Sequence, residues 1–188
     1  MEEIERLAEE FLAQVPGYVW DGATLPVPIE EIADSHAGLL VRDVEDLHQA
    51  PGAPARDDGQ ALSGLLLPTV GEIWVNAGEA RQWPPRRRFT IAHELGHWTL
   101  HRHAERSVFC RSGAIGAEPQ ERPPLAPHEQ EANVFAAALL MPARLVQEQY
   151  ARGDPFPRLC ETFAASGAAM GRRLKAVIRP AGGYLPVA

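Results

Sequence analysis

Residues 89–101 read FTIAHELGHWTLH, and two histidines in this stretch, His93 and His97, are four positions apart. Apolar residues flank them at the spacing of a helix that is buried over most of its surface. Residues i and i+4 lie one turn apart on the same face of a helix, so both imidazoles can bind a single Zn²⁺ ion. A metal also satisfies the polar ring atoms, which are costly to bury without a partner.

Glu94 directly follows the first of these histidines. In a helix its carboxylate reaches toward an attacking water and not toward the metal. HExxH on a helix is the pattern of zinc peptidases, in which this glutamate is the general base. The alternative is a surface helix with two solvated histidines. The apolar residues on both sides of the motif argue against it.

A catalytic zinc ion has a third protein ligand and an open fourth position. His101 lies about 12 Å beyond His93 along a straight helix, which is too far to share one ion. The next helical pattern, at 129–140, offers two carboxylates, Glu129 and Glu131. Glu131 falls on the apolar face of this helix, so we predict it as the third ligand. Glu129 lies off that face and suits the interaction of an acidic residue with the helix dipole.

Periodicity and turn residues predict an α+β fold, with a small antiparallel sheet packed beside a helical half and a short helical C-terminal appendage. Helices are expected at 4–15, 28–33, 84–101, 129–140, from 142 onward, 156–165 and 168–178. Strands are expected at 39–41, 62–67 and 72–76. The segment 102–128 is rich in Pro, Gly and charge and is predicted to be a long loop with an edge strand at 107–111.

The chain of 188 residues has 18 Lys and Arg against 25 Asp and Glu, a net charge of −7. This charge argues against direct nucleic-acid binding. No stretch approaches the roughly 20 apolar residues of a membrane span, and the acidic start lacks the pattern of a secretory signal. Two cysteines are too few for a disulfide framework. Together these features predict a cytoplasmic protein.

Two basic segments have alternative interpretations. The three arginines at 86–88 are expected to form an ion-paired helix face, and the alternative is a docking patch for an acidic partner. The tail at 159–177 loosely resembles a helix-turn-helix. Its cations would then meet phosphates, namely Arg172, Arg173 and Lys175. We prefer a packing appendage, because one imperfect match is a weak signal.

AHELGHWTLH (92–101), a long loop and EANVFAAALLMP (131–142) together resemble the ImmA/IrrE family of zinc metallopeptidases. VPIEEIA, SGLLLP and IWVN upstream are also similar to that family. The resemblance implies a gluzincin-like site in which His93, His97 and Glu131 hold one zinc ion and Glu94 is the catalytic base. The resemblance covers roughly residues 26–145. We predict a zinc metallopeptidase domain over residues 1–150, with the helical appendage at 151–188 packed on the same domain.

The resemblance further implies a zinc-dependent endopeptidase that cleaves a cytoplasmic regulatory protein, a helix-turn-helix transcriptional repressor. Two alternatives stay open, namely a binding module with a structural zinc ion, which has no need of Glu94, and a DNA-binding regulator, which the net charge disfavours.

Two features of the predicted site stay unassigned. Thermolysin-type gluzincins carry, four residues after the third ligand, an Asp that orients a zinc histidine, and the position four residues after Glu131 is Phe135. A hydrogen-bond donor for the transition state is also expected. The sequence does not rank its candidates, which are His103, His128 and Tyr150.

Overall fold

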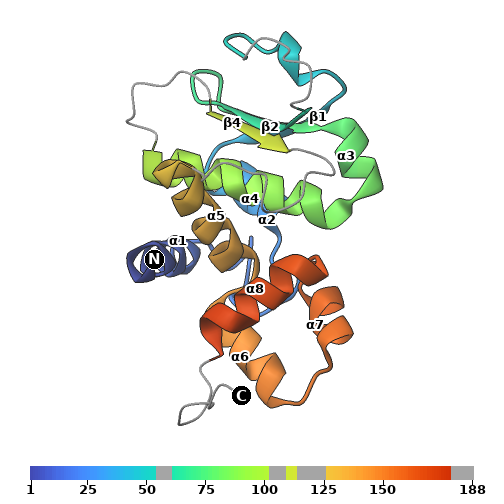
Figure 1. Ribbon diagram of the computed structural model, residues 1–188. Coiled ribbons are helices and arrows are strands. Elements are labelled where there is room, and N and C mark those ends of the chain that lie inside the picture. Colours follow the sequence, from blue (N-terminus) through green and yellow to red (C-terminus); the bar gives the residue numbers. More distant parts are fainter. Residues whose placement is uncertain (54–60, 102–108, 114–125, 179–188) are drawn as a thin grey trace.

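The computed structural model describes residues 1–53, 61–101, 109–113 and 126–178 (Figure 1). The α-helices are α1 (Glu2–Ala13), α2 (Ile29–Ser35), α3 (Ala77–Gln82), α4 (Pro84–His101), α5 (Pro127–Leu140), α6 (Ala143–Ala151), α7 (Phe156–Thr162) and α8 (Gly167–Val177). The strands are β1 (Leu40–Val44), β2 (Ala61–Leu67), β3 (Glu72–Asn76) and β4 (Phe109–Gly113), and a short 3-10 helix covers Leu47–Gln49. No helix among these residues is long and apolar enough to cross a membrane. The α+β class is confirmed.

The sheet has the strand order β1-β3-β2-β4 and is mixed, so it differs in one pair from the small antiparallel sheet that was predicted. The β2–β3 and β2–β4 pairs are antiparallel, but β1 and β3 are parallel. The order of the strands in the sheet differs from their order in the sequence, because β3 lies between β1 and β2. Strand β1 therefore lies on the outer side of the antiparallel β2–β3 pair, where a strand can run in either direction.

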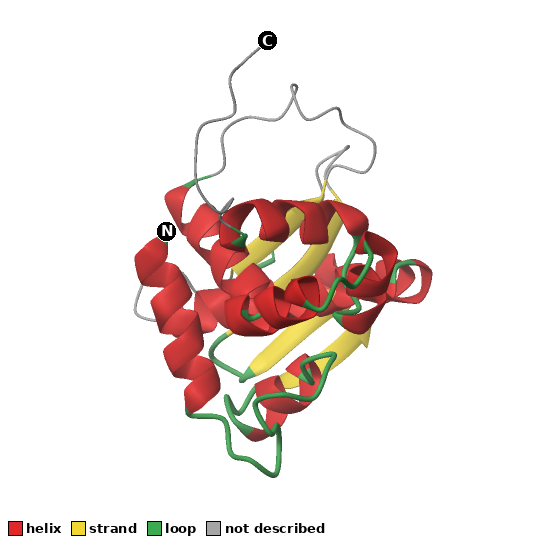
Figure 2. Cartoon of the chain, turned by 90° about the horizontal axis from the view of Figure 1, so that it is seen from below, coloured by secondary structure: helices red, strands yellow, loops and turns green. Residues whose placement is uncertain are grey.

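Helix α4 is the central element of the molecule. It runs along one face of the sheet, and α5 and α1 lie on its other side (Figure 1). The view from below shows this helical layer in front of the strands (Figure 2). Pro84 suits the first turn of a helix, where no backbone donor is needed. Every residue from Thr90 to His97 is buried, so α4 is in contact with neighbours on all sides over two turns.

The short helix α3 was not predicted from the sequence. It begins after Asn76, whose side-chain oxygen accepts a hydrogen bond from the backbone N–H of Glu79 at 3.0 Å. Asn followed three residues later by Glu is a helix-start signal, so the sequence did contain the information. The Glu79 side chain is 7% exposed and pairs with Arg86 of α4 at 2.6 Å, while Ser63 of β2 bonds to both of them.

The arginines at 86–88 form an ion-paired and hydrogen-bonded helix face, as expected. The contacts are Arg86 with Glu79, Arg87 with Glu30 and Asp43, and Arg88 with the backbone oxygen of Val27. These bonds tie the start of α4 to α2, α3 and β1.

The C-terminal helices pack against the rest of the chain. Leu159, Phe163 and Met170 are buried in the same hydrophobic cluster as residues of α4 and α5. The Arg173 side chain is 2% exposed, pairs with Glu5 of α1 and donates to the backbone oxygen of Met141 at 2.7 Å. These contacts fit the packing appendage and remove Arg173 from any contact with phosphates. The division of the chain at residue 150 stays a prediction.

Strand β2 lies very close to α4 at Gly64. The register shifts between Leu62 and Gly64, so Ser63 is the extra residue of a β-bulge, and both Ser63 and Gly64 meet α4. A Cβ atom at Gly64 would lie 2.3 Å from Thr90 Cγ2 and 3.2 Å from Glu94 Oε1. Only glycine allows the strand backbone to come this near.

Replacing Gly64 by alanine is therefore expected to lower the free energy of unfolding by about 1–3 kcal/mol, because the added methyl group overpacks a buried contact. The matched control is Gly171→Ala in α8, where a Cβ would meet nothing within 4 Å. That change should raise stability by about 0.5–1 kcal/mol, because alanine is the better helix former. Urea unfolding measures both values, and a neutral or stabilising Gly64→Ala would contradict the described packing.

Candidate metal centre

Two helices bring three potential metal ligands together. His93 and His97 lie one turn apart on α4, and Glu129 lies in the first turn of α5. The two Nε2 atoms are 3.1 Å apart. His93 Nε2 lies 3.2 Å from one carboxylate oxygen of Glu129, and His97 Nε2 lies 3.2 Å from the other. Among the described residues, this is the one group of three or more such side chains whose geometry could hold a metal ion.

The spacing of these donor atoms suits a zinc ion. Two ligands that are each about 2.0–2.1 Å from zinc at the tetrahedral angle lie about 3.3 Å apart. The observed separations of 3.1 and 3.2 Å are close to this value. Two imidazoles and one carboxylate are also the ligand set of a common class of catalytic zinc site.

A close contact between α4 and α5 makes this convergence possible. Gly96, which lies between the two histidines, faces Ala132 of α5. A Cβ at Gly96 would lie 3.2 Å from both the Cα and the backbone oxygen of Ala132. The absence of a side chain at Gly96 therefore lets α5 approach until Glu129, one turn before Ala132, meets the imidazoles.

The structure places the predicted third ligand outside this group and Glu129 inside it. Glu131 is not in the cluster: its side chain is 46% exposed and its carboxylate lies 3.5 Å from His101 Nε2. The sequence-based choice placed Glu131 on the same face of the helix as Phe135. Phe135 does lie near Gly96 of α4, but the backbone of α5 comes nearest to Gly96 at Ala132. Glu129 lies one turn before Ala132.

Asn133 was not identified from the sequence and lies beside the cluster. Its side-chain oxygen is 3.2 Å from His93 Nδ1. A proton on Nδ1 would be donated to this oxygen, and the lone pair that can bind a cation would then be on Nε2 of His93. Asn133 is four residues after Glu129. With Glu129 as the third ligand, Asn133 therefore has the place in the sequence at which thermolysin-type gluzincins carry the orienting Asp. Counted from Glu131, that place is taken by Phe135.

The electrostatics of the cluster favour an ionised carboxylate. Burial alone would raise the pKa of Glu129, but hydrogen bonds and charge interactions with His93 and His97 outweigh burial and hold this pKa far below its usual range. The two histidine side chains are 1% and 0% exposed, and that of Glu129 is 21% exposed. The cluster thus offers a negative charge to a cation at a nearly enclosed position.

Glu94 lies on a different face of α4 from the metal-ligand group. It is fully buried, and its Oε1 lies 3.2 Å from the place where a Cβ would stand on Gly64 of β2. Helix α4 therefore presents its histidines to α5 and the intervening glutamate to the sheet. Glu94 is therefore not a member of the group whose geometry could hold a metal ion.

The candidates for a transition-state hydrogen-bond donor differ in their positions. His128 is nearest the cluster, with its Nε2 3.5 Å from a Glu129 oxygen. Tyr150 is on α6 and is 49% exposed, and His103 lies outside the described residues. Next to the cluster, burial and the neighbouring His97 lower the pKa of His101.

A buried HExxH helix, a small sheet on one side and a helix that supplies a carboxylate on the other are features of metallopeptidases. The sequence matches the model of the peptidase M78 family, described as the IrrE N-terminal-like domain, over residues 45–175. The chain therefore belongs to this family, which confirms the resemblance found in the sequence.

One solved structure, titled "Mycobacterium tuberculosis transcriptional regulator", is similar to this fold with a TM-score of 0.55 and 17% sequence identity. The similarity covers 96% of this chain and 48% of that chain, so the present chain spans about half the length of its structural relative. At this identity the likeness shows a shared fold. No curated protein matches the sequence.

The two glutamates of α5 make a direct test of the metal centre. Glu129→Ala is expected to lower zinc affinity by at least about 100-fold, because it removes one of three ligands. Glu131→Ala removes the same charge two residues away and should leave the affinity nearly unchanged. Competition with a chromophoric chelator measures both constants. A loss of affinity in the Glu131 variant alone would restore the original prediction and contradict the described geometry.

Proposed function

We propose that this protein is a zinc-dependent endopeptidase, with His93, His97 and Glu129 as the ligands of one zinc ion and Glu94 as the general base. The convergence of the three ligand atoms is the observation that carries this proposal. Membership of a peptidase family supports it. Glu94 directly follows the first histidine of the HExxH pattern, and this position supports the assignment of the base.

The residues of the cluster would prepare the site for a cation. His93 and His97 would each offer Nε2, and Asn133 would fix the tautomer and the ring orientation of His93. Glu129 would contribute the negative charge. When bound, a zinc ion supplies Lewis acidity, which polarises a scissile carbonyl and lowers the pKa of an attacking water toward about 7.

Glu94 would transfer the protons of the reaction. Its carboxylate would accept a proton from the attacking water and return it to the amine that leaves when the peptide bond breaks. Contact with β2 at Gly64 would limit the movement of this side chain between the two transfers. Water is the nucleophile and the proton ends on the new amine, so the reaction is a balanced hydrolysis.

The proposed substrate is a protein, as family membership suggests, and more specifically a cytoplasmic helix-turn-helix transcriptional repressor. This finer proposal rests on the resemblance of the sequence to the ImmA/IrrE family. Strand β4 is one of the two edge strands of the sheet and covers Phe109–Gly113, close to the edge strand predicted at 107–111. An extended substrate segment would add to such an edge through backbone hydrogen bonds.

The two alternative functions fit the described residues less well. A structural zinc site is closed by a fourth protein ligand, and the group found in the described part of the chain has three members. A DNA-binding regulator would use the cations of the tail, and Arg173 is instead buried against Glu5.

Glu94→Gln tests the catalytic role. The variant should keep one zinc ion per chain and lose hydrolysis by about 100-fold or more, because an amide cannot accept the proton. Mass spectrometry of new protein N-termini, after incubation of the zinc-loaded protein with a lysate of the source cells, measures the activity. Glu131→Gln is the matched control and should retain it. Full turnover by Glu94→Gln would refute the assigned base.

Substrate selectivity is a separate prediction. The zinc-loaded protein should hydrolyse casein no faster than a blank, and should cut a repressor at a single site in a linker between folded elements. Substrates that must add to one edge strand are restricted to exposed extended segments. Gel electrophoresis over several hours measures both reactions. Rapid cleavage of casein at many sites would contradict the proposed selectivity.

A further inference from the structure

His101 is the last residue of α4 and lies beside the metal-ligand group without being a member of it. Its side chain is 14% exposed, and the function proposed above gives it no role. The His101 ring contacts the ring of His97, with the centroids 5.5 Å apart, and the ring of His128, with the centroids 6.2 Å apart. The His97 and His128 rings are themselves 5.9 Å apart. Three imidazoles therefore pack together, and one of them is a proposed ligand.

His101 also contacts the chain just before and shortly after Glu129. Its Nε2 lies 3.5 Å from a carboxylate oxygen of Glu131, and its ring forms a hydrogen bond with the backbone of His128. Burial and His97 lower the pKa of His101, whereas this bond raises it, so the ring donates the proton and the backbone oxygen accepts it. Nε2 has no hydrogen-bond partner among the described residues, which assigns the bond to Nδ1.

The first turn of α5, which carries Glu129, needs contacts of this kind. Its N-cap residue is Ala126, which makes no side-chain cap hydrogen bond. The backbone N–H groups of Glu129 and Gln130 donate to the backbone oxygen of Ala126 at 3.0 and 3.1 Å. A helix end without a capping side chain opens more readily than a capped one. The position of Glu129 therefore depends on neighbours that hold this turn in place.

The contacts of α5 described above lie further along the helix. Gly96 meets α5 at Ala132, and His93 meets it at Asn133. His101 reaches the turn before them. Because its own ring packs on the ring of His97, it connects one proposed ligand to the turn that carries another.

We propose that His101 is a positioning residue, which fixes the first turn of α5 and so holds the Glu129 carboxylate beside the two histidines before any metal binds. The bond to the backbone of His128 carries most of this effect. The Glu131 side chain is 46% exposed, and its distance of 3.5 Å is long for a hydrogen bond, in keeping with the small effect expected of Glu131→Ala. A ligand that is already in place loses less conformational entropy when the ion binds.

Two substitutions in the full chain separate the hydrogen bond from the packing of the ring. His101→Leu keeps a side chain of similar size and removes the donor, whereas His101→Asn keeps an N–H donor close to the position of Nδ1. Competition with a chromophoric chelator measures the zinc affinity. His101→Leu should weaken it by about tenfold or more, which is typical for the loss of a group that orients a ligand, and His101→Asn should stay within about threefold of the unchanged protein.

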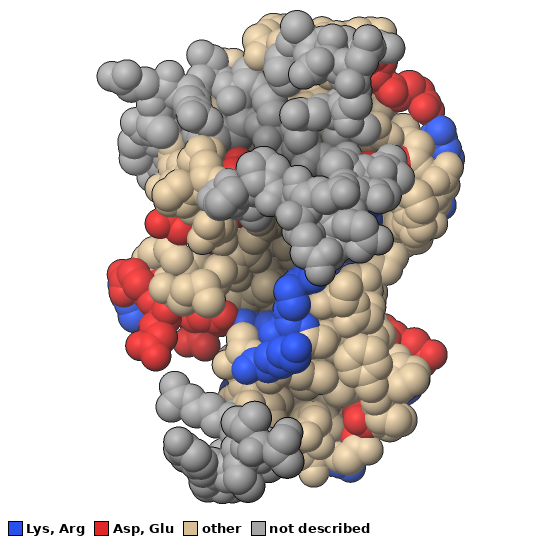
Figure 3. All heavy atoms as spheres, in the orientation of Figure 1, with Lys and Arg blue, Asp and Glu red and all other residues tan. Residues whose placement is uncertain are grey.

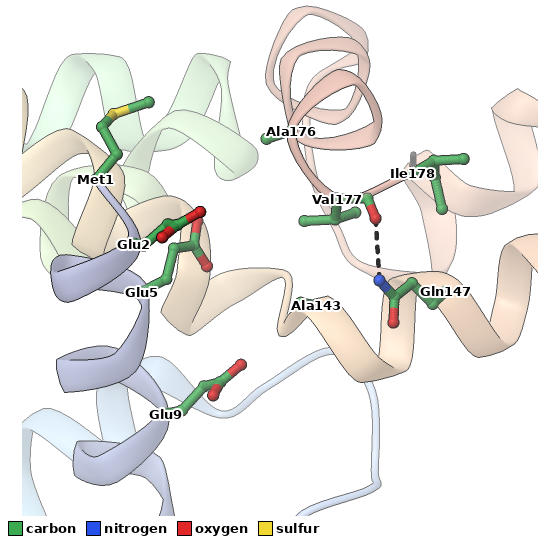
Figure 4. Close-up of a pocket in the computed structure, with 9 residues that line it drawn as sticks. All are labelled: Met1, Glu2, Glu5, Glu9, Ala143, Gln147, Ala176, Val177 and Ile178. Carbon is green, nitrogen blue, oxygen red and sulfur yellow. Dashed lines mark hydrogen bonds between the residues drawn. The ribbon is translucent and has the colours of Figure 1, made fainter. Parts of the chain in front are cut away.

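The matched control removes a hydrogen bond of the same type far from the metal centre. Gln147 donates to the backbone oxygen of Val177 at 2.9 Å in a groove between α1, α6 and α8, drawn as a dashed line in Figure 4. Gln147→Leu should leave the zinc affinity unchanged. Exposed carboxylates can also bind zinc weakly, and Figure 3 shows acidic side chains gathered where α1 lies, at the left of the view. A chelator that binds zinc tightly excludes such weak sites from the measurement.

Hydrogen exchange in the metal-free protein tests the same inference without zinc. In His101→Leu the backbone amides of Glu129 and Gln130 should exchange about tenfold faster or more, because the first turn opens more often. The amide of Met141, which bonds to the backbone oxygen of Ala137 at the other end of α5, should exchange at an unchanged rate. Equal acceleration at both ends would show a general loss of stability and would overturn the proposal.

The inference rests on the proposed metal centre but not on peptidase activity. An unchanged zinc affinity in His101→Leu would overturn it. So would an equal loss in His101→Asn, because packing of the ring would then explain the effect, or an equal loss in Gln147→Leu. If the unchanged protein binds no zinc, the proposed function is contradicted, and the exchange rates of the metal-free protein still decide whether His101 holds the first turn of α5.

Discussion

The distance between α4 and α5 is the constraint on which the candidate site depends. Gly96 and Ala132 meet with so little space that a single Cβ would lie 3.2 Å from the backbone of α5. Because Gly96 stands between His93 and His97, this contact sets how far Glu129 lies from both imidazoles. The small residues in the contact are thus as necessary to the proposed metal centre as its proposed ligands.

The same helix is held equally closely on its other side. Gly64 in the bulge of β2 lies against Thr90 and Glu94, and the bulge is anchored by the hydrogen bonds of Ser63 with Arg86 and Glu79. Buried charged groups are costly unless they are paired, so this polar network favours one position of β2 over others. Helix α4 is consequently fixed between two layers, with the ligands toward one and the proposed base toward the other.

Much of this arrangement was predictable from the sequence. The helix at 84–101 and the strand at 72–76 have the predicted bounds, because their hydrophobic patterns and their Pro and Gly boundaries agree. HExxH predicted that His93 and His97 lie together, as the structure has them, because helical spacing is a local property. The sequence predicted Glu131 as the third ligand, whereas the structure places Glu129 beside the two histidines. This choice depends on how α5 is rotated against α4, which the periodicity of α5 alone does not determine. The parallel pairing of β1 likewise depends on contacts between distant segments.

The central claim is that His93, His97 and Glu129 together bind a zinc ion. Anomalous diffraction from crystals of the zinc-loaded protein, recorded on both sides of the zinc absorption edge, tests it most directly. The account predicts one strong anomalous peak about 2.0–2.2 Å from Nε2 of each histidine and from a carboxylate oxygen of Glu129. A peak coordinated by Glu131 and His101, or a protein that binds no zinc, would contradict the account.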